Sequence, residues 1–259
     1  MKKRASEVDA YLNSMGLFSN LDNYINSLGG RFFFNADNTS GKLFFDNLSK
    51  LLPELKQSYS KGKLFYRARI VECRTGHCEL NYDAFEAFSK EELGAPPVWK
   101  ACDGRVNPKG ISYLYLSDSR RCALAEVRPN ISSLVAIGEG AISKDIKLIS
   151  FAKQNETLLS QEDRSFYELL KRVFSAPTNG QLSTEYLPSQ VIAEFIKLKG
   201  YDGIEYISAQ EKHGTNITLF DTSSWSATGS RLFEVSDIRY TAQRERGRVE
   251  ILGYPDEEL

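Results

Sequence analysis

The spacing of apolar residues changes at Leu64, and this change limits the possible folds more than any other feature of the chain. Before it, apolar side chains recur at helical intervals, most clearly through residues 44–55. After it, the segment 64–70 alternates and directs Arg67 and Arg69 to one face of a strand. Helical spacing followed by alternation predicts an α+β fold with a helical N-terminal extension.

The segments after residue 70 predict a mixed order of strands and helices. Ser119 is placed to cap a short helix through Ala123, and Gly200 is placed to end a longer one. We expect strands at 111–116, 134–137, 146–151, 203–208, 216–221 and 231–240, and helices at 163–174 and 186–199. Residues 71–103 show no sustained period and are expected to form an excursion over a pocket.

Size and charge limit the classes of function. The chain has 259 residues, 41% of them hydrophobic, which is enough for a large core. Its net charge of -1 comes from 33 basic and 34 acidic residues, without a long basic run. We therefore expect no direct binding of nucleic acid. No stretch reaches the length of a membrane span, so a cytoplasmic protein without membrane contact is predicted.

The cysteines raise the question of a metal. Cys73, His77 and Cys78 lie close together, but a second pair of ligands at zinc-like spacing is missing. We predict no metal site and expect Cys102 and Cys122, like the first two, to be reduced thiols.

Arginine, tyrosine and glutamate residues gather between 104 and 129, and their types indicate a ligand. Guanidinium groups bind phosphate oxygens, carboxylates accept hydrogen bonds from ribose hydroxyls, and aromatic faces hold flat bases. A carboxylate beside the ribose would also stabilise the oxocarbenium character that develops when an N-glycosidic bond breaks. Gly138-Glu139-Gly140 is not a complete dinucleotide-binding fingerprint, so hydride transfer is not indicated.

Each of these residues also has an ordinary structural interpretation. Arg67 and Arg69 can pair with surface acids, and Tyr113 and Tyr115 are common strand residues. Glu126 follows the apolar residues Ala-Leu-Ala, where an acid held by a salt bridge in the core is an equal alternative. Ser208 alone carries little weight.

The order of the motifs resembles one family. Tyr66-Arg67-Ala68-Arg69, Gly104-Arg105-Val106-Asn107, Ala123-Leu124-Ala125-Glu126 and Gly203-Ile204-Glu205-Tyr206-Ile207-Ser208 follow one another along the chain. This order is similar to that of the RES domain, which is named for its arginine, glutamate and serine. The resemblance implies a central mixed β-sheet similar to that of ADP-ribosyltransferase toxins, with the cleft for NAD where the sheet is split. It divides the chain into a helical extension at 1–62, a RES catalytic domain at 63–225 and a C-terminal segment at 226–259 packed on the core.

The resemblance also assigns roles to residues. It implies that Glu126 acts on the nicotinamide ribose and its cation-like transition state, that Arg67 and Arg105 hold the phosphates, and that Ser208 makes a hydrogen bond in the cleft. Tyr115 is implied to stack on or position the substrate. The further substrate-binding candidates are Arg69, Tyr113 and Asn216.

The resemblance implies an enzyme that consumes NAD and a partner, an Xre-type antitoxin of a bacterial toxin–antitoxin pair. NAD is the substrate, inorganic phosphate or water is the acceptor, and no resident cofactor is expected. Phosphorolysis would give ADP-ribose 1-phosphate and nicotinamide, and hydrolysis would give ADP-ribose and nicotinamide. A protein ADP-ribosyltransferase and a catalytically silent nucleotide- or partner-binding module remain alternatives.

Overall fold

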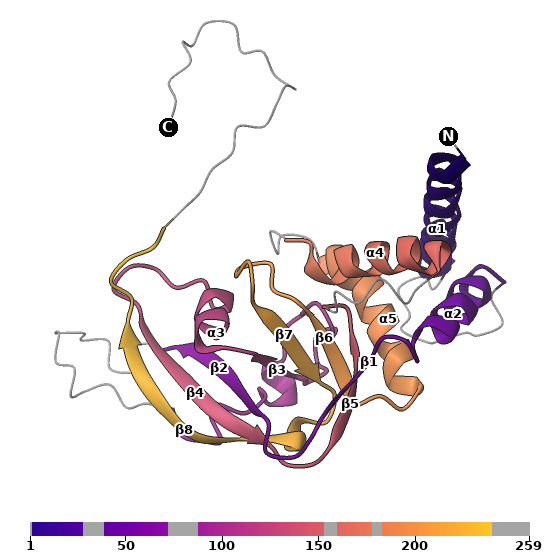
Figure 1. The fold of residues 1–259 in the computed structure, drawn as a ribbon. Coiled ribbons are helices and arrows are strands. Elements are labelled where there is room, and N and C mark those ends of the chain that lie inside the picture. Colours follow the sequence, from indigo (N-terminus) through magenta and orange to yellow (C-terminus); the bar gives the residue numbers. More distant parts are fainter. Residues whose placement is uncertain (1, 28–38, 72–87, 153–159, 178–182, 240–259) are drawn as a thin grey trace, which may run out of the picture.

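A computed structural model describes residues 2–27, 39–71, 88–152, 160–177 and 183–239, and it shows an α+β protein (Figure 1). The helices are α1 (Lys2–Ser27), α2 (Thr39–Leu51), α3 (Arg120–Glu126), α4 (Gln161–Ser175) and α5 (Leu187–Leu198). The strands are β1 (Lys56–Tyr59), β2 (Leu64–Ile70), β3 (Leu114–Ser117), β4 (Leu134–Ile142), β5 (Ile146–Ser150), β6 (Gly203–Ile207), β7 (Thr215–Leu219) and β8 (Trp225–Glu234). Short 3₁₀ helices lie at Val98–Lys100, Ser183–Tyr186 and Thr222–Ser224.

The described strands form one mixed sheet of eight strands in the order β1-β5-β6-β7-β3-β2-β4-β8. Strands β5 and β6 run parallel, whereas the other neighbouring pairs run antiparallel. This mixed sheet, preceded in the chain by helices α1 and α2, confirms the predicted α+β fold class.

The sheet nearly divides between β2 and β3. Strand β2 pairs with β4 from Leu64 to Ile70, but it pairs with β3 only at Tyr66 and Ser117. Two half-sheets, β2-β4-β8 and β1-β5-β6-β7-β3, therefore meet at one residue pair and diverge beyond it. Divergence of two strands leaves backbone and side chains of both facing a common space.

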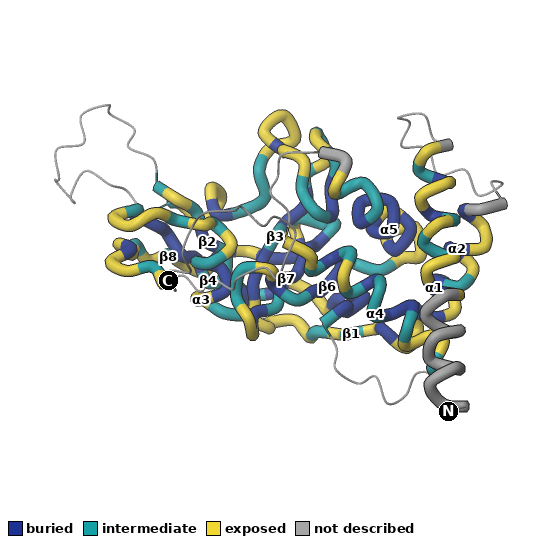
Figure 2. The backbone as a smooth tube through the Cα atoms, turned by 90° about the horizontal axis from the view of Figure 1, so that it is seen from above, coloured by how far each residue is buried: buried dark blue, intermediate teal, exposed yellow. Residues whose placement is uncertain are grey.

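The helices cover the two half-sheets unequally. Helices α1, α2, α4 and α5 gather at the β1-β5-β6 end, and α3 lies alone over β2 and β4 (Figure 1). Aromatic residues join three of these helices, α1, α2 and α4, since the Phe18 ring packs edge-on against Phe44 at 5.5 Å and against Phe166 at 5.9 Å. Figure 2 shows that buried residues lie along the middle of the molecule, from β2 to α5, with intermediate and exposed stretches between them.

The segments on either side of the predicted catalytic domain both contribute a strand to the sheet. Strand β1 belongs to residues 1–62, where helices were expected, and it forms one edge of the sheet beside β5. The Tyr59 hydroxyl donates to Glu205 Oε1 at 2.5 Å and so ties β1 to β6. Strand β8 forms the other edge and includes most of the described part of the C-terminal segment. The expected strand at 231–240 begins earlier, at Trp225, and residues 240–259 lie outside the described part.

Several local predictions are confirmed. The helices expected at 163–174 and 186–199 are α4 and α5, and Gly200 ends α5 with a positive φ of 82°. The Ser119 side chain caps α3 by accepting from the Cys122 amide. This helix is three residues longer than expected and ends at Glu126 instead of Ala123.

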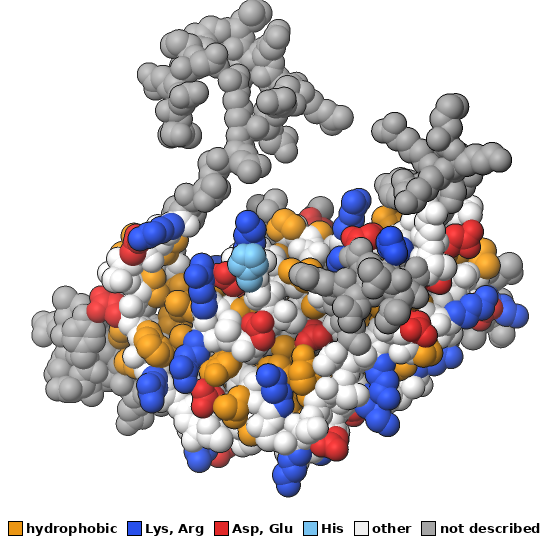
Figure 3. Space-filling view, viewed as in Figure 1, with side chains coloured by type: hydrophobic (Ala, Val, Ile, Leu, Met, Phe, Trp, Pro, Cys, Tyr) orange, Lys and Arg blue, Asp and Glu red, His pale blue; other side chains and the backbone are white. Residues whose placement is uncertain are grey.

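Surface charge shows no separation of sign on the face drawn in Figure 3, where lysine and arginine side chains alternate with acidic ones. None of the described helices combines the length and the hydropathy that a membrane span requires.

Candidate active site

A cavity of about 280 Å³ opens where β2 and β3 diverge. Strands β2, β3, β6 and β7 and helix α3 supply its walls. The lining residues are Tyr66, Arg67, Ala68, Tyr115, Leu116, Ser117, Ala123, Glu126, Val127, Tyr206 and Asn216. Four sequence-predicted residues, Arg67, Tyr115, Glu126 and Asn216, thus come together from four separate elements.

Glu126 lines the cavity and is held by two hydrogen bonds to one of its oxygens. Ser208 Oγ donates to its Oε1 at 2.5 Å, and Asn216 Nδ2 donates to the same atom at 2.7 Å. The described residues provide no donor to Oε2. Glu126 is exposed at the end of α3 and forms no ion pair with a described residue, so the alternative of a salt-bridged core acid is wrong.

Ser208 is itself fixed by the turn that follows β6. Its Oγ accepts from the backbone amides of Gln210 and Glu211, each at 3.0 Å. A hydroxyl that accepts two amide protons has its own proton free to donate, and it donates to Glu126. The Arg-Glu-Ser order of the sequence therefore ends in a direct contact between the glutamate and the serine.

Arg67 faces the same cavity with part of its hydrogen-bonding capacity unused. Its Nη1 is buried and has no hydrogen-bond partner among the residues that the structure describes. Burial, and then the charge of Arg69, lower the pKa of Arg67 to about 10. A buried guanidinium with an unused donor is costly unless a ligand supplies the acceptor.

Tyr115 connects the cavity wall to the loop at 104–107. Its hydroxyl donates to Asn107 Oδ1 at 2.5 Å and accepts from the Val106 amide at 3.0 Å. Burial raises the pKa of Tyr115 well above its usual value. A Cβ on Gly104 would lie 2.5 Å from the Tyr115 hydroxyl, so this contact requires glycine there. Tyr115 thus lines the cavity and holds the loop through its hydroxyl.

Arg105 and Tyr113 do not line this cavity. The Arg105 guanidinium donates to the carbonyls of Val173 at 3.1 Å and Ala176 at 2.6 Å, at the C-terminal end of α4. Helix-end carbonyls lack partners within the helix and attract cations, which explains this placement. Tyr113 is buried in the core, where its hydroxyl accepts from Lys197 Nζ at 3.1 Å.

Arg69 borders a second, larger cavity of about 820 Å³, which shares Ala68 and Val127 with the first. Residues of the 88–100 segment form its other side, as expected for an excursion over a pocket. Arg69 has partners of its own, because its Nη1 donates to the Glu92 carbonyl and its guanidinium lies 5.5 Å from the Phe88 ring centre.

Sequence reasoning missed Ser117 and Tyr206, which both line the smaller cavity. Alternation was a usable signal for each: Ser117 lies two residues after Tyr115 on β3, and Tyr206 lies two residues before Ser208. Burial raises the pKa of Tyr206 above its usual value, so its hydroxyl stays protonated.

The residues of this site fall within a segment that matches a family model. The model of the RES domain matches residues 67–242, which is more than half of the chain. The chain belongs to the RES domain family. The match includes Arg67, Glu126 and Ser208 and extends beyond the boundary at 225 that was expected from the sequence.

No curated protein matches this RES protein. Among solved structures, a chain of the M. tuberculosis MbcT–MbcA toxin–antitoxin complex is similar to it, with 10% sequence identity and a TM-score of 0.43. The similarity covers 73% of this chain and 93% of the other.

The described side chains of this RES protein offer no cluster of three or more potential metal ligands. Cys102 and Cys122 are free thiols, and Cys73, His77 and Cys78 lie outside the described residues. The site instead combines an incompletely bonded guanidinium, a carboxylate with one open oxygen and aromatic walls, a set suited to an anion that carries a sugar.

Proposed function

We propose that this RES protein cleaves NAD between the nicotinamide and its ribose. The observation that carries the proposal is the cavity in which Glu126 presents an open Oε2 beside Arg67, whose buried Nη1 has no partner among the described residues. The carboxylate suits the positive charge that develops on the ribose, and the guanidinium suits a phosphate oxygen.

The two cavities together offer room for a dinucleotide. The smaller one, about 280 Å³, lies near the low end of ligand sites, which range over roughly 300–1,000 Å³. It accommodates the nicotinamide riboside end, and the larger one of about 820 Å³ accommodates the remainder beyond Ala68 and Val127. Arg69 borders that second space, in keeping with its expected role in substrate binding.

The chemistry needs one carboxylate and no resident cofactor. As the C–N bond breaks, its electron pair leaves with the nicotinamide ring, which carried the positive charge and departs as a neutral molecule. Glu126 stabilises the resulting cation on the ribose, and an acceptor then adds to the opposite face. Water gives ADP-ribose and a proton, whereas inorganic phosphate gives ADP-ribose 1-phosphate.

In a cell this reaction would drain NAD and arrest growth. We therefore propose that the protein acts as a bacterial toxin in the cytoplasm, with an Xre-type antitoxin as its partner, which rests on the family resemblance. Induced expression of the wild type should lower cellular NAD and stop growth, and Glu126→Gln should do neither.

The deciding experiment incubates purified protein with NAD, with and without inorganic phosphate, and identifies the products by mass spectrometry. ADP-ribose 1-phosphate that requires phosphate identifies a phosphorylase, and ADP-ribose in both samples identifies a hydrolase. If NAD stays intact except when a protein acceptor gains ADP-ribose, the protein is an ADP-ribosyltransferase. Intact NAD in every sample would leave only a binding module.

A further inference from the structure

The side-chain amide of Asn216 links Glu126 to Ser117 in the wall of the smaller cavity. Its Nδ2 donates to Glu126 Oε1 at 2.7 Å, and its Oδ1 accepts from Ser117 Oγ at 2.9 Å. Ser117 and Asn216 are paired residues on the neighbouring strands β3 and β7, so the backbone register holds them face to face. Asn216 therefore transmits the position of Ser117 to the carboxylate.

We infer that Ser117 is a positioning residue that anchors Asn216 and, through it, Glu126. Both Ser117 and Asn216 are buried, with 4% and 5% of their surface exposed. Since water has little access, the Oδ1 atom depends on protein donors. Its other neighbour, Cys122 Sγ at 3.5 Å, is a weak donor. Without the Ser117 hydroxyl, the amide would have to turn to satisfy its oxygen and would withdraw Nδ2 from Glu126.

Loss of this anchor would change the orientation of the Glu126 carboxylate. With both donors on Oε1, the carboxylate plane is fixed and Oε2 is the oxygen available to a ligand. Loss of the Asn216 donor would leave Ser208 as the single support, about which the carboxylate can swing. The part of this inference that concerns catalysis rests on the proposed NAD cleavage, whereas the anchoring of Asn216 does not.

The anchoring is tested with Ser117→Thr and Ser117→Val, which have nearly the same shape and differ in the hydroxyl. Both are β-branched and suit a strand. The side-chain amide protons of Asn216, identified in NMR spectra by their loss in Asn216→Ala, report the bond to Glu126. We expect slow solvent exchange in the wild type and Ser117→Thr, and exchange about tenfold faster in Ser117→Val, as for a lost buried hydrogen bond. Equal exchange in the Thr and Val variants would overturn the inference.

Nicotinamide release gives the second readout. Ser117→Val should lower kcat about tenfold relative to Ser117→Thr with little change in KM. In an Asn216→Ala background the same exchange of Thr for Val should leave kcat unchanged, since the path to Glu126 is already cut. A loss that persists in that background would show a merely structural role and contradict the inference.

Measurements of stability and of wild-type activity distinguish a variant that does not fold from a failure of the proposed function. Thermal melting identifies a variant that does not fold, and Ser117→Ala then replaces Ser117→Val as the variant without the hydroxyl. If the wild type releases no nicotinamide, the proposed function fails, and amide exchange alone still decides whether Ser117 anchors Asn216.

Discussion

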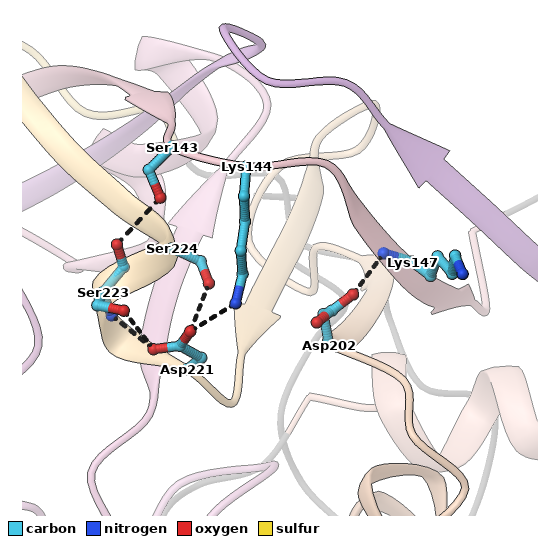
Figure 4. Close-up of polar contacts among 7 residues, drawn as sticks. All are labelled: Ser143, Lys144, Lys147, Asp202, Asp221, Ser223 and Ser224. Atoms are coloured by element: carbon cyan, nitrogen blue, oxygen red, sulfur yellow. Dashed lines mark hydrogen bonds and ion pairs between the residues drawn. The ribbon is translucent and has the colours of Figure 1, made fainter.

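Two polar clusters of this protein differ in how completely their charged groups are bonded. Around Asp221, shown in Figure 4, both carboxylate oxygens have donors. Lys144 Nζ donates to Oδ2 at 2.7 Å and Ser224 Oγ donates to it at 3.0 Å, while the amide and hydroxyl of Ser223 donate to Oδ1 at 3.0 and 2.6 Å. This cluster ties the turn after β4 to the segment between β7 and β8.

The cavity cluster has the opposite character. Glu126 uses one oxygen for Ser208 and Asn216, and the described residues leave the other open. Arg67 is half-buried, and its buried Nη1 has no hydrogen-bond partner among the described residues. A fully bonded cluster stabilises the fold, whereas an incomplete one retains the desolvation cost of its groups until a ligand completes it. The Asp221 cluster is therefore structural, whereas the incomplete bonding of the cavity residues supports the proposed ligand site.

The largest expected effect is that of Glu126→Gln. Glutamine keeps the shape and an oxygen for Ser208, but it removes the charge that stabilises the ribose cation. We expect kcat for nicotinamide release to fall about 10³-fold, the scale of losing one electrostatic element of an active site. Product analysis by mass spectrometry measures this, and thermal melting should be close to wild type. Unchanged kcat would mean that the open carboxylate oxygen is not the reacting group.

The two arginines of β2 provide a matched pair. Arg67→Lys should lower kcat/KM about 100-fold, because an ammonium cannot reproduce the forked contact to a phosphate. Arg69→Lys should cost less than about fivefold, since Arg69 is already held by the Glu92 carbonyl and the Phe88 ring. Equal losses in the two variants would contradict the distinction between an unpaired and a paired guanidinium.

Arg67 should also lower the stability of the free protein. Burial lowers its pKa to about 10 from a usual value near 12.5, so the unfolded chain binds more protons between these two pH values. Stability should rise with pH across that window, and the full penalty, roughly 3 kcal/mol, is present below it. Arg67→Met should therefore unfold at a higher denaturant concentration at pH 7 and lose NAD cleavage. Denaturant titration with and without ADP-ribose checks this, since the ligand should stabilise the wild type alone.

The sequence predicted local structure well where one residue decides it. Gly200 ends α5 and Ser119 caps α3, as expected. Few residue types other than glycine adopt a positive φ readily, and few side chains accept a hydrogen bond from a free amide at the start of a helix. The alternation of β2 placed Arg67 and Arg69 on one face, but it could not show that they border different cavities, which depends on where β3 diverges.

The site itself depended on long-range packing. Glu126 lies 82 positions before Ser208 and 90 positions before Asn216 in the sequence. The three residues meet because of the order of the strands in the sheet, which residue spacing does not predict. Family order brought them into consideration before their contact was known. For Arg105 the family order does not decide the role, since two of its guanidinium nitrogens donate to carbonyls at the end of α4.

A smaller effect is expected at Arg105. Arg105→Met removes two donors from the carbonyls of Val173 and Ala176 and should lower the free energy of unfolding by about 1–2 kcal/mol. Arg172→Met, at an exposed position of α4, is the matched control, and its free energy of unfolding should stay within about 0.5 kcal/mol of the wild-type value. If Arg105→Met instead raises KM for NAD without loss of stability, the phosphate-binding role implied by the family resemblance would be favoured over the structural one.

The smallest effect should come from the fully bonded cluster. Hydrogen bonds from Lys144 and Ser223 hold the pKa of Asp221 below its usual range, so the charged carboxylate stabilises the fold at pH values above the pKa of the unfolded chain, and this contribution is lost as pH falls through the folded value. Because the ion pair is half exposed, with 50% and 44% of the two side chains accessible, Asp221→Asn should cost only about 0.5–1 kcal/mol at pH 7. The difference from wild type should shrink below about pH 4 in denaturant titrations. NAD cleavage should remain at the wild-type level, and a loss of cleavage without a loss of stability would remove the contrast between the two clusters.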